Sequence, residues 1–292
     1  MSDQCKTCPS SGGCTIDPAD CGTAVEKSLL GSLNDIRNVI VVMSGKGGVG
    51  KSTVSVNLAV ALARQGMKVG LIDADLYGPS IPRMMGVEDY QRQVDYIDEK
   101  EVFHPVERFG VKMISIGFFI SKEKPLIWRG PMAASALTQL FENTEWGEID
   151  YMIIDFPPGT GDIQLTTLQK LNLTGAIVVT TPQEVAVNDA RKAVSMLMDP
   201  HIKVPVLGIV ENMSGFARPS CGEITAIFNS GAGEALADQF GLRLLGKIPI
   251  DPMICSSGDQ GKPFAYHFSN TPTAKAFETI IEPILALSDN KK

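Results

Sequence analysis

Residues 45–52 read Gly45-Lys46-Gly47-Gly48-Val49-Gly50-Lys51-Ser52, and Thr53 follows. This stretch fits the phosphate-loop pattern, which is a glycine, four residues, and then Gly-Lys-Ser. The glycines let the backbone curl, so that successive N–H groups point at phosphate oxygens. In this pattern Lys51 neutralises the β and γ phosphates, and the Ser52 hydroxyl binds Mg²⁺. The stretch therefore predicts a site for a nucleotide on residues 45–53.

The residues on either side have the composition of a strand and a helix. Residues 39–43 form a short apolar, β-branched run, which is typical of a buried parallel strand. Residues 52–64 follow with apolar side chains available to pack in a helix. A helix that starts at the loop adds its positive dipole end to the phosphate site. Strand, glycine loop and helix is the context that the pattern requires.

Acidic residues follow two further predicted strands. The strand predicted at 68–72 runs into Asp73 and Asp75, and the strand predicted at 151–155 ends in Asp155. Carboxylates at the carboxyl ends of parallel strands face the ligand crevice of an open α/β sheet. We expect Asp73 to hold Mg²⁺ through water, Asp155 to be the second metal-side carboxylate, and Asp75 to orient or deprotonate the attacking water. The alternative for Asp75 is a helix N-cap.

The segment after Asp155 reads Phe-Pro-Pro-Gly-Thr-Gly-Asp and ends at Asp162. The prolines stiffen this turn, and Gly159 allows the backbone to approach a γ phosphate closely. Loss of that phosphate on hydrolysis would release the segment, which is a common switch mechanism. Asp162 belongs to this predicted switch segment, and the alternative is that it caps the helix that follows.

Two more residues are candidates for contacts with a nucleotide base. Asn212 follows the strand predicted at 204–210, and an amide at a strand terminus can read the adenine edge through its donor and acceptor pair. The alternative is an Asx turn. Asp251 follows the strand predicted at 242–248, in a loop that can flank the adenine.

Four of the six cysteines lie in the first 21 residues, which predicts a module of residues 1–30 separate from a domain of residues 31–292. In a reducing compartment such crowding points to metal or redox chemistry more than to disulfides. The spacing is compatible with a [4Fe-4S] cluster or a zinc ion, and one C-x2-C followed by wider gaps leans toward iron–sulfur. The third interpretation is a disordered tail with adventitious thiols. The four candidate ligands are Cys5, Cys8, Cys14 and Cys21.

The pattern from residue 38 onward alternates strand and helix, which predicts an α/β fold with one doubly wound, mostly parallel sheet. Residues 88–110 are charged and aromatic and predict a surface excursion or hairpin. The helix predicted at 184–198 includes Val185 among its core-compatible positions. Cys255 is expected to be a small buried hydrophobe. A closing helix at 273–287 is expected to be interrupted near Pro283.

Composition argues against several classes of protein. The formal net charge is -7 with no dense Lys/Arg block, which argues against sequence-independent nucleic-acid binding. No apolar run reaches the length of a membrane span. The first five residues are neither basic nor apolar, which predicts no signal peptide and a cytoplasmic location.

The early lysine of the loop carries a family resemblance. Lys-Gly-Gly-Val-Gly-Lys-Ser resembles the deviant phosphate loop of the MinD, ParA, nitrogenase iron protein and Mrp-type ATPases, and the segment 155–162 resembles the Mrp-type branch. The resemblance implies an ATP-hydrolysing homodimer in which Lys46 reaches the partner's nucleotide, Asp75 is the hydrolytic residue and Asn212 reads the adenine. From the residues alone, the alternative for Lys46 is a solvated loop charge.

Two cysteine segments resemble this family less closely. Cys5, Cys8 and Cys14 are similar to part of the N-terminal motif of the NBP ATPases, where the fourth cysteine lies upstream, so Cys21 has to substitute for it. Residues 214–222 resemble a segment ending in C-P-x-C-G, whose two cysteines bridge a [4Fe-4S] cluster across the dimer in the family. Here Arg218 replaces the first cysteine and Cys221 remains. Cys221 is thus a weak ligand or an inert thiol.

Three functions follow as hypotheses. The first is an ATP-dependent carrier that binds a [4Fe-4S] cluster and passes it to apo iron–sulfur proteins. The second is a positioning ATPase like MinD or ParA, without metal, although the closing helix is not Lys-rich as a membrane-targeting helix is. The third is an electron donor like the nitrogenase iron protein, which needs cysteines at two separated positions of each subunit.

Overall fold

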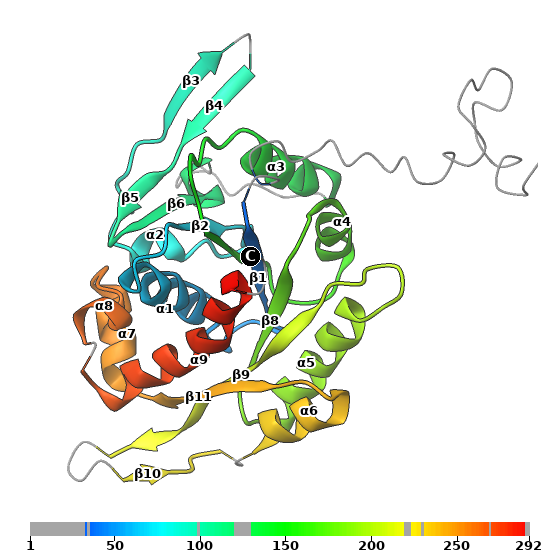
Figure 1. Cartoon of the computed structure of the whole chain (residues 1–292), viewed down its shortest axis with the longest axis vertical. Helices are drawn as coiled ribbons and strands as arrows, with labels where there is room; N and C mark the ends of the chain where they lie inside the picture. The colour runs from blue at the N-terminus through cyan, green and yellow to red at the C-terminus, as the bar shows by residue number, and fades with distance from the viewer. Residues whose placement is uncertain are drawn as a thin grey trace, which may run out of the picture.

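The computed structural model describes residues 33, 36–97, 100–119, 130–218, 223–228, 231–268 and 270–289. Over most of this part the chain alternates between strands and helices, and the consecutive strands of residues 93–115 and 206–225 and the consecutive helices of residues 252–289 depart from this pattern (Figure 1). The predicted cysteine-rich module of residues 1–30 lies outside the described residues. The elements that follow are those of the predicted α/β domain.

The strands are β1 (Asn38–Met43), β2 (Val69–Asp73), β3 (Gln93–Ile97), β4 (Lys100–His104), β5 (Val106–Arg108), β6 (Val111–Ser115), β7 (Tyr151–Asp155), β8 (Gly175–Thr180), β9 (Val206–Ala217), β10 (Ile224–Thr225) and β11 (Leu244–Ile250). The helices are α1 (Lys51–Arg64), α2 (Ile81–Met84), η2 (Ile116–Phe119), α3 (Gly130–Glu142), α4 (Asp162–Lys170), α5 (Glu184–Leu197), α6 (Ala232–Phe240), α7 (Pro252–Asp259), α8 (Phe264–His267) and α9 (Pro272–Asp289).

One mostly parallel sheet forms the centre of the molecule. Its strand order is β10-β9-β8-β1-β7-β2-β6-β5, and β11 also pairs with β9. The pairs of β5 with β6 and of β10 with β9 are antiparallel, and the other pairs of this sheet are parallel. After β1 the chain forms β2 and β7 on one side of β1, and it then crosses to form β8 on the other side. Such a reversal of strand order creates a ligand crevice at the carboxyl ends of the strands.

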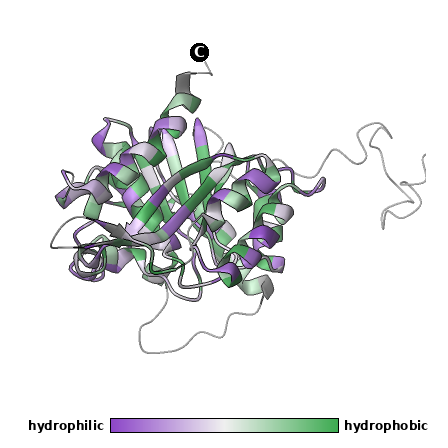
Figure 2. Ribbon diagram, turned by 90° about the horizontal axis from the view of Figure 1, so that it is seen from below, coloured by the Kyte–Doolittle hydropathy of each residue, from purple (hydrophilic) through white to green (hydrophobic). Residues whose placement is uncertain are grey.

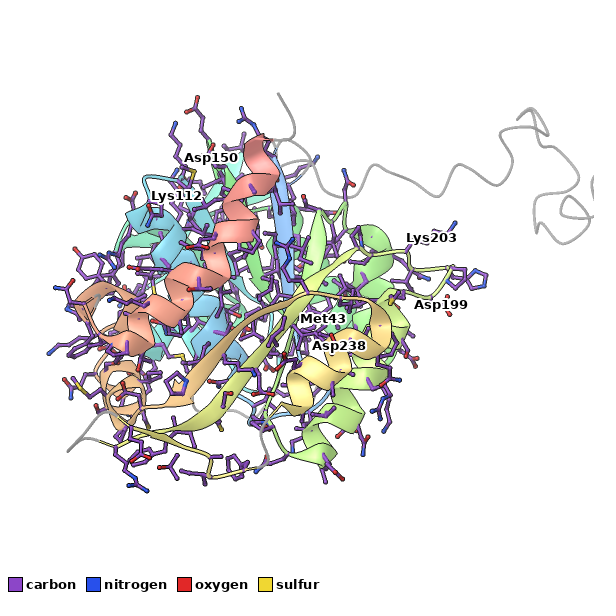
Figure 3. All side chains as sticks on the ribbon, turned by 60° about the horizontal axis from the view of Figure 1, so that its bottom comes forward. Met43, Lys112, Asp150, Asp199, Lys203 and Asp238 are labelled. Carbon is purple, nitrogen blue, oxygen red and sulfur yellow. The ribbon has the colours of Figure 1, made fainter. Side chains whose placement is uncertain are left out.

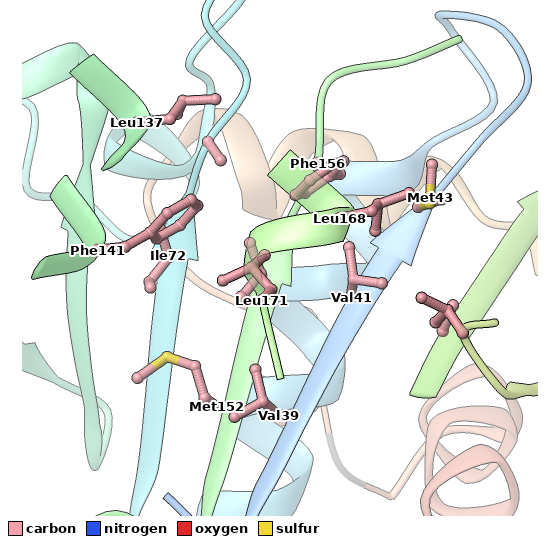
Figure 4. Close-up of a cluster of buried hydrophobic side chains, with 14 of the residues drawn as sticks. Val39, Val41, Met43, Ile72, Leu137, Phe141, Met152, Phe156, Leu168 and Leu171 are labelled. Carbon is pink, nitrogen blue, oxygen red and sulfur yellow. The ribbon is translucent and has the colours of Figure 1, made fainter. Parts of the chain in front are cut away.

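Helices cover both faces of this sheet, and strand alternation decides which side chains meet them. Val39, Val41 and Met43 of β1 belong to one apolar cluster with residues of α3, α4, α5 and α6. Figure 4 shows Leu168 beside Val41 and Met43, and Met152 beside Val39. Ile40 and Val42 of the same strand face the opposite cluster, which contains residues of α1, α8 and α9. The sheet is therefore doubly wound, as the sequence predicted.

The hydropathy of the ribbon follows this layering. In Figure 2 the strands are mainly green, and the helices around them carry purple segments. Polar side chains lie at the amino-terminal ends of the strands, where Lys112 belongs to β6 and Asp150 comes just before β7 (Figure 3). The residues predicted to bind a nucleotide lie at the opposite, carboxyl-terminal ends of the strands. No helix in the described ranges combines the length and the apolar character needed to cross a membrane.

The expected excursion at residues 88–110 contains an antiparallel hairpin of β3 and β4, which extends away from the sheet in Figure 1. Its backbone is anchored where Phe103 accepts from the N–H of Glu145 at 2.9 Å and donates to the carbonyl of Asn143 at 2.7 Å. The prediction of a hairpin is confirmed.

Three local predictions were wrong. α9 continues through Pro283 because its buried face, with Phe277, Ile280 and Ile284, packs on the domain on both sides of the proline. β9 continues to Ala217, because its outer part pairs with β10. Val185 is 66% exposed, since it lies in the first turn of α5, just beyond the carboxyl end of β8.

Candidate nucleotide site

The phosphate loop joins the buried strand β1 to the long helix α1. Gly48 and Gly50 have φ angles of +81° and +83°, values that favour glycine because other side chains are strained there. Gly50 is the N-cap of α1 and supplies no side-chain acceptor to the first turn. The N–H groups of that turn are therefore available to an anion, and the helix dipole favours negative charge there.

The side chains of the loop meet the carboxylate of Asp155. Lys51 Nζ lies 2.8 Å from Oδ2 of Asp155, and Ser52 Oγ donates to the same oxygen at 2.7 Å. Lys51 Nζ is also 3.4 Å from Oδ2 of Asp75. Burial acts to lower the pKa of Lys51, but Asp155 and Asp75 outweigh it and raise that pKa above its ordinary value. The structure thus brings together four residues that the sequence assigned to phosphate, metal and water.

Sheet register places the two predicted metal-side carboxylates, Asp73 and Asp155, next to each other. Asp73 lies opposite Asp155 in the pairing of β2 with β7, and opposite Ser115 in the pairing of β2 with β6. Asp73 is fully buried and accepts from Ser115 Oγ at 2.9 Å. Burial, and then the charge of Asp155, raise the pKa of Asp73 to about 8. Asp73 therefore keeps a proton near neutral pH when no metal ion is bound beside it.

Asp75 is positioned by the turn that follows β2. Its Oδ1 accepts from the N–H of Tyr77 at 3.2 Å, which is an Asx-type turn. The N-cap of the next helix, α2, is Ser80, so the N-cap alternative for Asp75 is wrong. Asp75 remains 8% exposed in a small cavity beside the loop.

The proline-rich segment after Asp155 contacts the phosphate loop through its backbone. Gly159 has a φ of +98° and donates its N–H to the carbonyl of Ser44 at 2.9 Å. The side chain of Gln164 donates to the carbonyl of Pro158 at 2.9 Å. Asp162 is the first residue of α4, whose N-cap is Gly161, so its charge faces the helix dipole but it is not the cap. The segment is thus hydrogen-bonded to the residue that precedes the phosphate loop.

Two adjoining cavities run along the loop. A cavity of about 240 Å³ is lined by Gly47, Lys51, Ser52 and Asp75. A larger one of about 460 Å³ lies beyond it. Gly50, Thr53, Ser80 and Met84 line both, so the two form a continuous groove. The smaller cavity includes the charged and hydroxyl side chains of Lys51, Ser52 and Asp75 in its lining, and the larger is lined mainly by apolar groups.

Asn212, Asp251 and Cys255 line the larger cavity. Asn212 lies inside β9 and not at its end, and its Nδ2 donates to the carbonyl of Val49 at 2.8 Å. The amide has a second N–H and a carbonyl oxygen for a base. The Asx-turn alternative is wrong, since the amide reaches across to the loop.

Asp251 and Cys255 lie on α7. Asp251 is the N-cap of this helix, accepting from the N–H of Met253 at 2.9 Å, and its other oxygen accepts from Thr273 Oγ1 at 2.9 Å. It lines the cavity as a structural residue. Cys255 is exposed, so the expectation of a buried hydrophobe is wrong; it faces a hollow that the apolar groups of α7 do not fill.

Lys46 is half-buried within the loop, and its carbonyl accepts from Ser44 Oγ at 2.9 Å. Arg218 lies on the surface, with its guanidinium 3.3 Å from the carboxylate of Glu223. The cysteines assigned to a cluster, Cys5, Cys8, Cys14, Cys21 and Cys221, all lie outside the described residues.

Sequence reasoning missed three polar residues that organise the site. Ser55 Oγ donates to Oδ1 of Asp155 at 2.6 Å, and Ser115 donates to Asp73. Glu211 is buried, and its carboxylate accepts from the N–H of Gly233 at 2.6 Å at the start of α6. Ser55 follows Lys51 by one helical turn, so its spacing could have indicated that it faces the same strand end.

Comparison with known families decides the classification. The model described as ParA, NUBPL iron-transfer P-loop NTPase, matches residues 35–285. This chain belongs to that family. Members of the NUBPL iron-transfer family are P-loop NTPases, in agreement with the loop and strand-end carboxylates described above.

Similar proteins carry related names. An iron-sulfur cluster carrier protein of Aquifex aeolicus is 46% identical over 257 residues, which are 88% of this chain and 69% of that protein. One of Methanocaldococcus jannaschii is 42% identical over 291 residues, or 99% and 98% of the two chains. The iron-sulfur cluster transfer protein NUBPL of Dictyostelium discoideum is 42% identical over 254 residues, or 87% and 77%.

Solved structures agree with the fold. A nucleotide-binding protein of Archaeoglobus fulgidus in complex with ADP shares 40% identity and a TM-score of 0.71, over 85% of this chain and 94% of that one. The cell division ATPase MinD of Pyrococcus furiosus has 24% identity and a TM-score of 0.62, over 86% and 100%. At that identity MinD shows the fold alone, so the hypothesis of a positioning ATPase is not favoured.

Proposed function

We propose that this protein is an ATP-hydrolysing carrier that binds an iron–sulfur cluster and transfers it to apo iron–sulfur proteins. The observation that carries the proposal is the convergence of Lys51, Ser52 and Asp155 beside a base-sized cavity, in a chain of the NUBPL iron-transfer family. The cluster is cargo, and the nucleotide site supplies the energy that controls its binding and release.

The described residues suit the phosphates of ATP, the attacking water and the base. The N–H groups of the first turn of α1 bind the phosphates, Lys51 moves from Asp155 to the β and γ phosphates, and Asp75 orients the attacking water. The base enters the larger cavity beside Asn212. Loss of the γ phosphate frees Gly159 and the segment around it, which changes the surface that a partner meets.

The donor set at the loop also fits Mg²⁺. A hydroxyl and two carboxylates from Ser52, Asp155 and Asp73 are hard oxygen ligands, which this cation prefers. In the described ranges no group of three His, Cys, Asp or Glu side chains could hold a metal alone. That agrees with Mg²⁺, which one or two protein groups usually hold together with nucleotide phosphates. When bound, Mg²⁺ offsets the negative charge of the phosphates.

The cluster is assigned to the N-terminal cysteines and not to Cys221, because Arg218 stands where the C-P-x-C-G pattern has its first cysteine. Similarity to the Methanocaldococcus carrier extends over 99% of this chain and thus includes the N-terminal region. We assign a [4Fe-4S] cluster to Cys5, Cys8, Cys14 and Cys21. We further propose a cytoplasmic homodimer in which Lys46 reaches the partner's nucleotide, with slow hydrolysis until a recipient protein binds.

Anaerobic reconstitution with iron and sulfide tests the cargo. We expect bound iron, a broad absorption band near about 400 nm from cysteine-ligated iron–sulfur charge transfer, and loss of both when the four cysteines are changed together to serine. A colourless protein, or equal iron in the quadruple variant, would reject the N-terminal site. Lys51→Ala is the matched control: it should abolish ATP binding and leave the iron in place.

A further inference from the structure

The carboxylate of Asp155 accepts three hydrogen bonds from one side of the loop. Its Oδ2 accepts from Lys51 at 2.8 Å and from Ser52 at 2.7 Å. Its Oδ1 accepts from Ser55 Oγ at 2.6 Å. Asp155 and Ser55 are both fully buried, so water cannot replace these donors.

Two of these three donors have other tasks when a nucleotide is bound. The ammonium of Lys51 turns to the phosphates, so its bond to Oδ2 is lost. The oxygen of Ser52 binds the metal with a lone pair, so its bond to Oδ2 depends on where the metal lies. Ser55 is the donor whose bond to the carboxylate involves neither nucleotide nor metal, because its side chain starts one helical turn further along α1 and reaches only the far oxygen of the carboxylate.

The hydroxyl of Ser55 has a choice of acceptors. Its Oγ lies 2.6 Å from Oδ1 of Asp155 and 3.1 Å from the carbonyl of Lys51. A hydroxyl has one proton, and the shorter of the two bonds, to the carboxylate oxygen, is the stronger. The proton therefore belongs to the bond with Asp155, and this bond fixes the rotation of the carboxylate about its side chain.

We propose that Ser55 is a positioning residue for the metal of the nucleotide site: by donating to Oδ1 of Asp155, it keeps Oδ2 turned toward Ser52, where Mg²⁺ would bind. The inference rests on the proposed function, since it needs a magnesium nucleotide in this groove. Ser55 does not touch nucleotide or metal. Partners of this kind, which orient a metal-binding group, typically change metal affinity by about 10- to 100-fold when removed.

The experiment measures binding of a fluorescent ADP analogue to the full-length protein, in EDTA and over a series of Mg²⁺ concentrations. We expect Ser55→Ala to bind the analogue in EDTA as the wild type does, and to need about 10- to 100-fold more Mg²⁺ for half of the magnesium-dependent effect. Ser55→Thr keeps the hydroxyl and should restore the wild-type response. Thr138→Ala is the matched control, because Thr138 is a helical hydroxyl of α3 that donates to the carbonyl of Ala134 at 2.9 Å.

Three results overturn the proposal. One is an unchanged Mg²⁺ response in Ser55→Ala. Another is an equal loss of binding with and without Mg²⁺, since Ser55 would then support the loop and not the metal. If Ser55→Ala does not fold, Ser55→Cys replaces it in the experiment, because a thiol fills the same space and is only a weak donor. A wild-type Mg²⁺ response in Ser55→Cys is then the third result that overturns the proposal. A wild type that binds the analogue without any response to Mg²⁺ would refute the proposed nucleotide chemistry itself.

Discussion

Lys51 and Asp155 form a buried ion pair across the phosphate loop. Their charged atoms are 2.8 Å apart, and 6% and 0% of the two side chains are exposed. The lysine that should bind phosphate is thus held by the carboxylate that should serve the metal. A nucleotide must break this pair to bind, and it supplies phosphate charge to Lys51 in exchange.

The pair predicts that Lys51→Met weakens both binding and folding. Loss of the lysine leaves Asp155 buried with hydroxyl donors only, which we expect to cost about 2 kcal/mol of the free energy of unfolding, while nucleotide binding is lost. Urea denaturation and a binding titration measure the two effects. Combining Lys51→Met with Asp155→Asn should recover part of the stability. Strictly additive losses would mean that the pair does not couple in the folded protein.

Asp73 predicts a pH dependence of stability without nucleotide and metal. Its folded pKa of about 8 lies above the ordinary value of 3.8 for this carboxyl group, so the folded state holds a proton that the unfolded state has released between these values. Stability therefore falls as pH rises through this window, by up to about 1.4 kcal/mol per pH unit, and levels off above the folded pKa.

Urea denaturation in EDTA between pH 5.5 and 8.5 measures this slope. Asp73→Asn should flatten it, because the amide does not titrate. Asp238→Asn is the control, since this carboxylate is exposed on α6 (Figure 3). A slope that Asp73→Asn leaves intact would assign the titration to another group.

The sequence predicted the sheet and the loop because both depend on local patterns. Buried β-branched runs give β1 and β7, and the glycine pattern gives the turn before Lys51. The sheet register could not be predicted in the same way. It places Asp73 between Asp155 and Ser115, and it arises from the pairing of three strands that are distant in the chain.

Side-chain roles that depend on packing were predicted less well. Asn212 contacts the loop at Val49 from a part of β9 past the expected end of the strand, and this part pairs with β11. Pro283 does not interrupt α9, since packing on both sides outweighs a lost hydrogen bond. In both cases tertiary contacts override a local rule that was correct in isolation.

Two glycines of the loop should differ sharply when replaced by alanine. A Cβ at Gly45 would lie 2.1 Å from the backbone of Asp189 in α5, and backbone cannot move aside cheaply. A Cβ at Gly47 would meet nothing within 4 Å. We expect Gly45→Ala to lower the free energy of unfolding by about 2 kcal/mol or more, and Gly47→Ala to change it by less than about 1 kcal/mol. Chemical denaturation of the two variants tests the docking of the loop on α5, and equal losses would contradict it.

The exposed thiol of Cys255 tests where the base binds. It lines the larger cavity, so a bulky maleimide on its sulfur should fill the space that we assign to the base and prevent nucleotide binding. Bound ADP should slow this modification, as measured by mass spectrometry of the peptide that contains Cys255. Other cysteines of the chain also react, and Cys255→Ser separates their effects: after the same treatment it should still bind nucleotide. If the wild type, fully modified at Cys255, bound nucleotide as before, the base would have to lie outside this cavity, and the assignment of Asn212 to the base would fall with it.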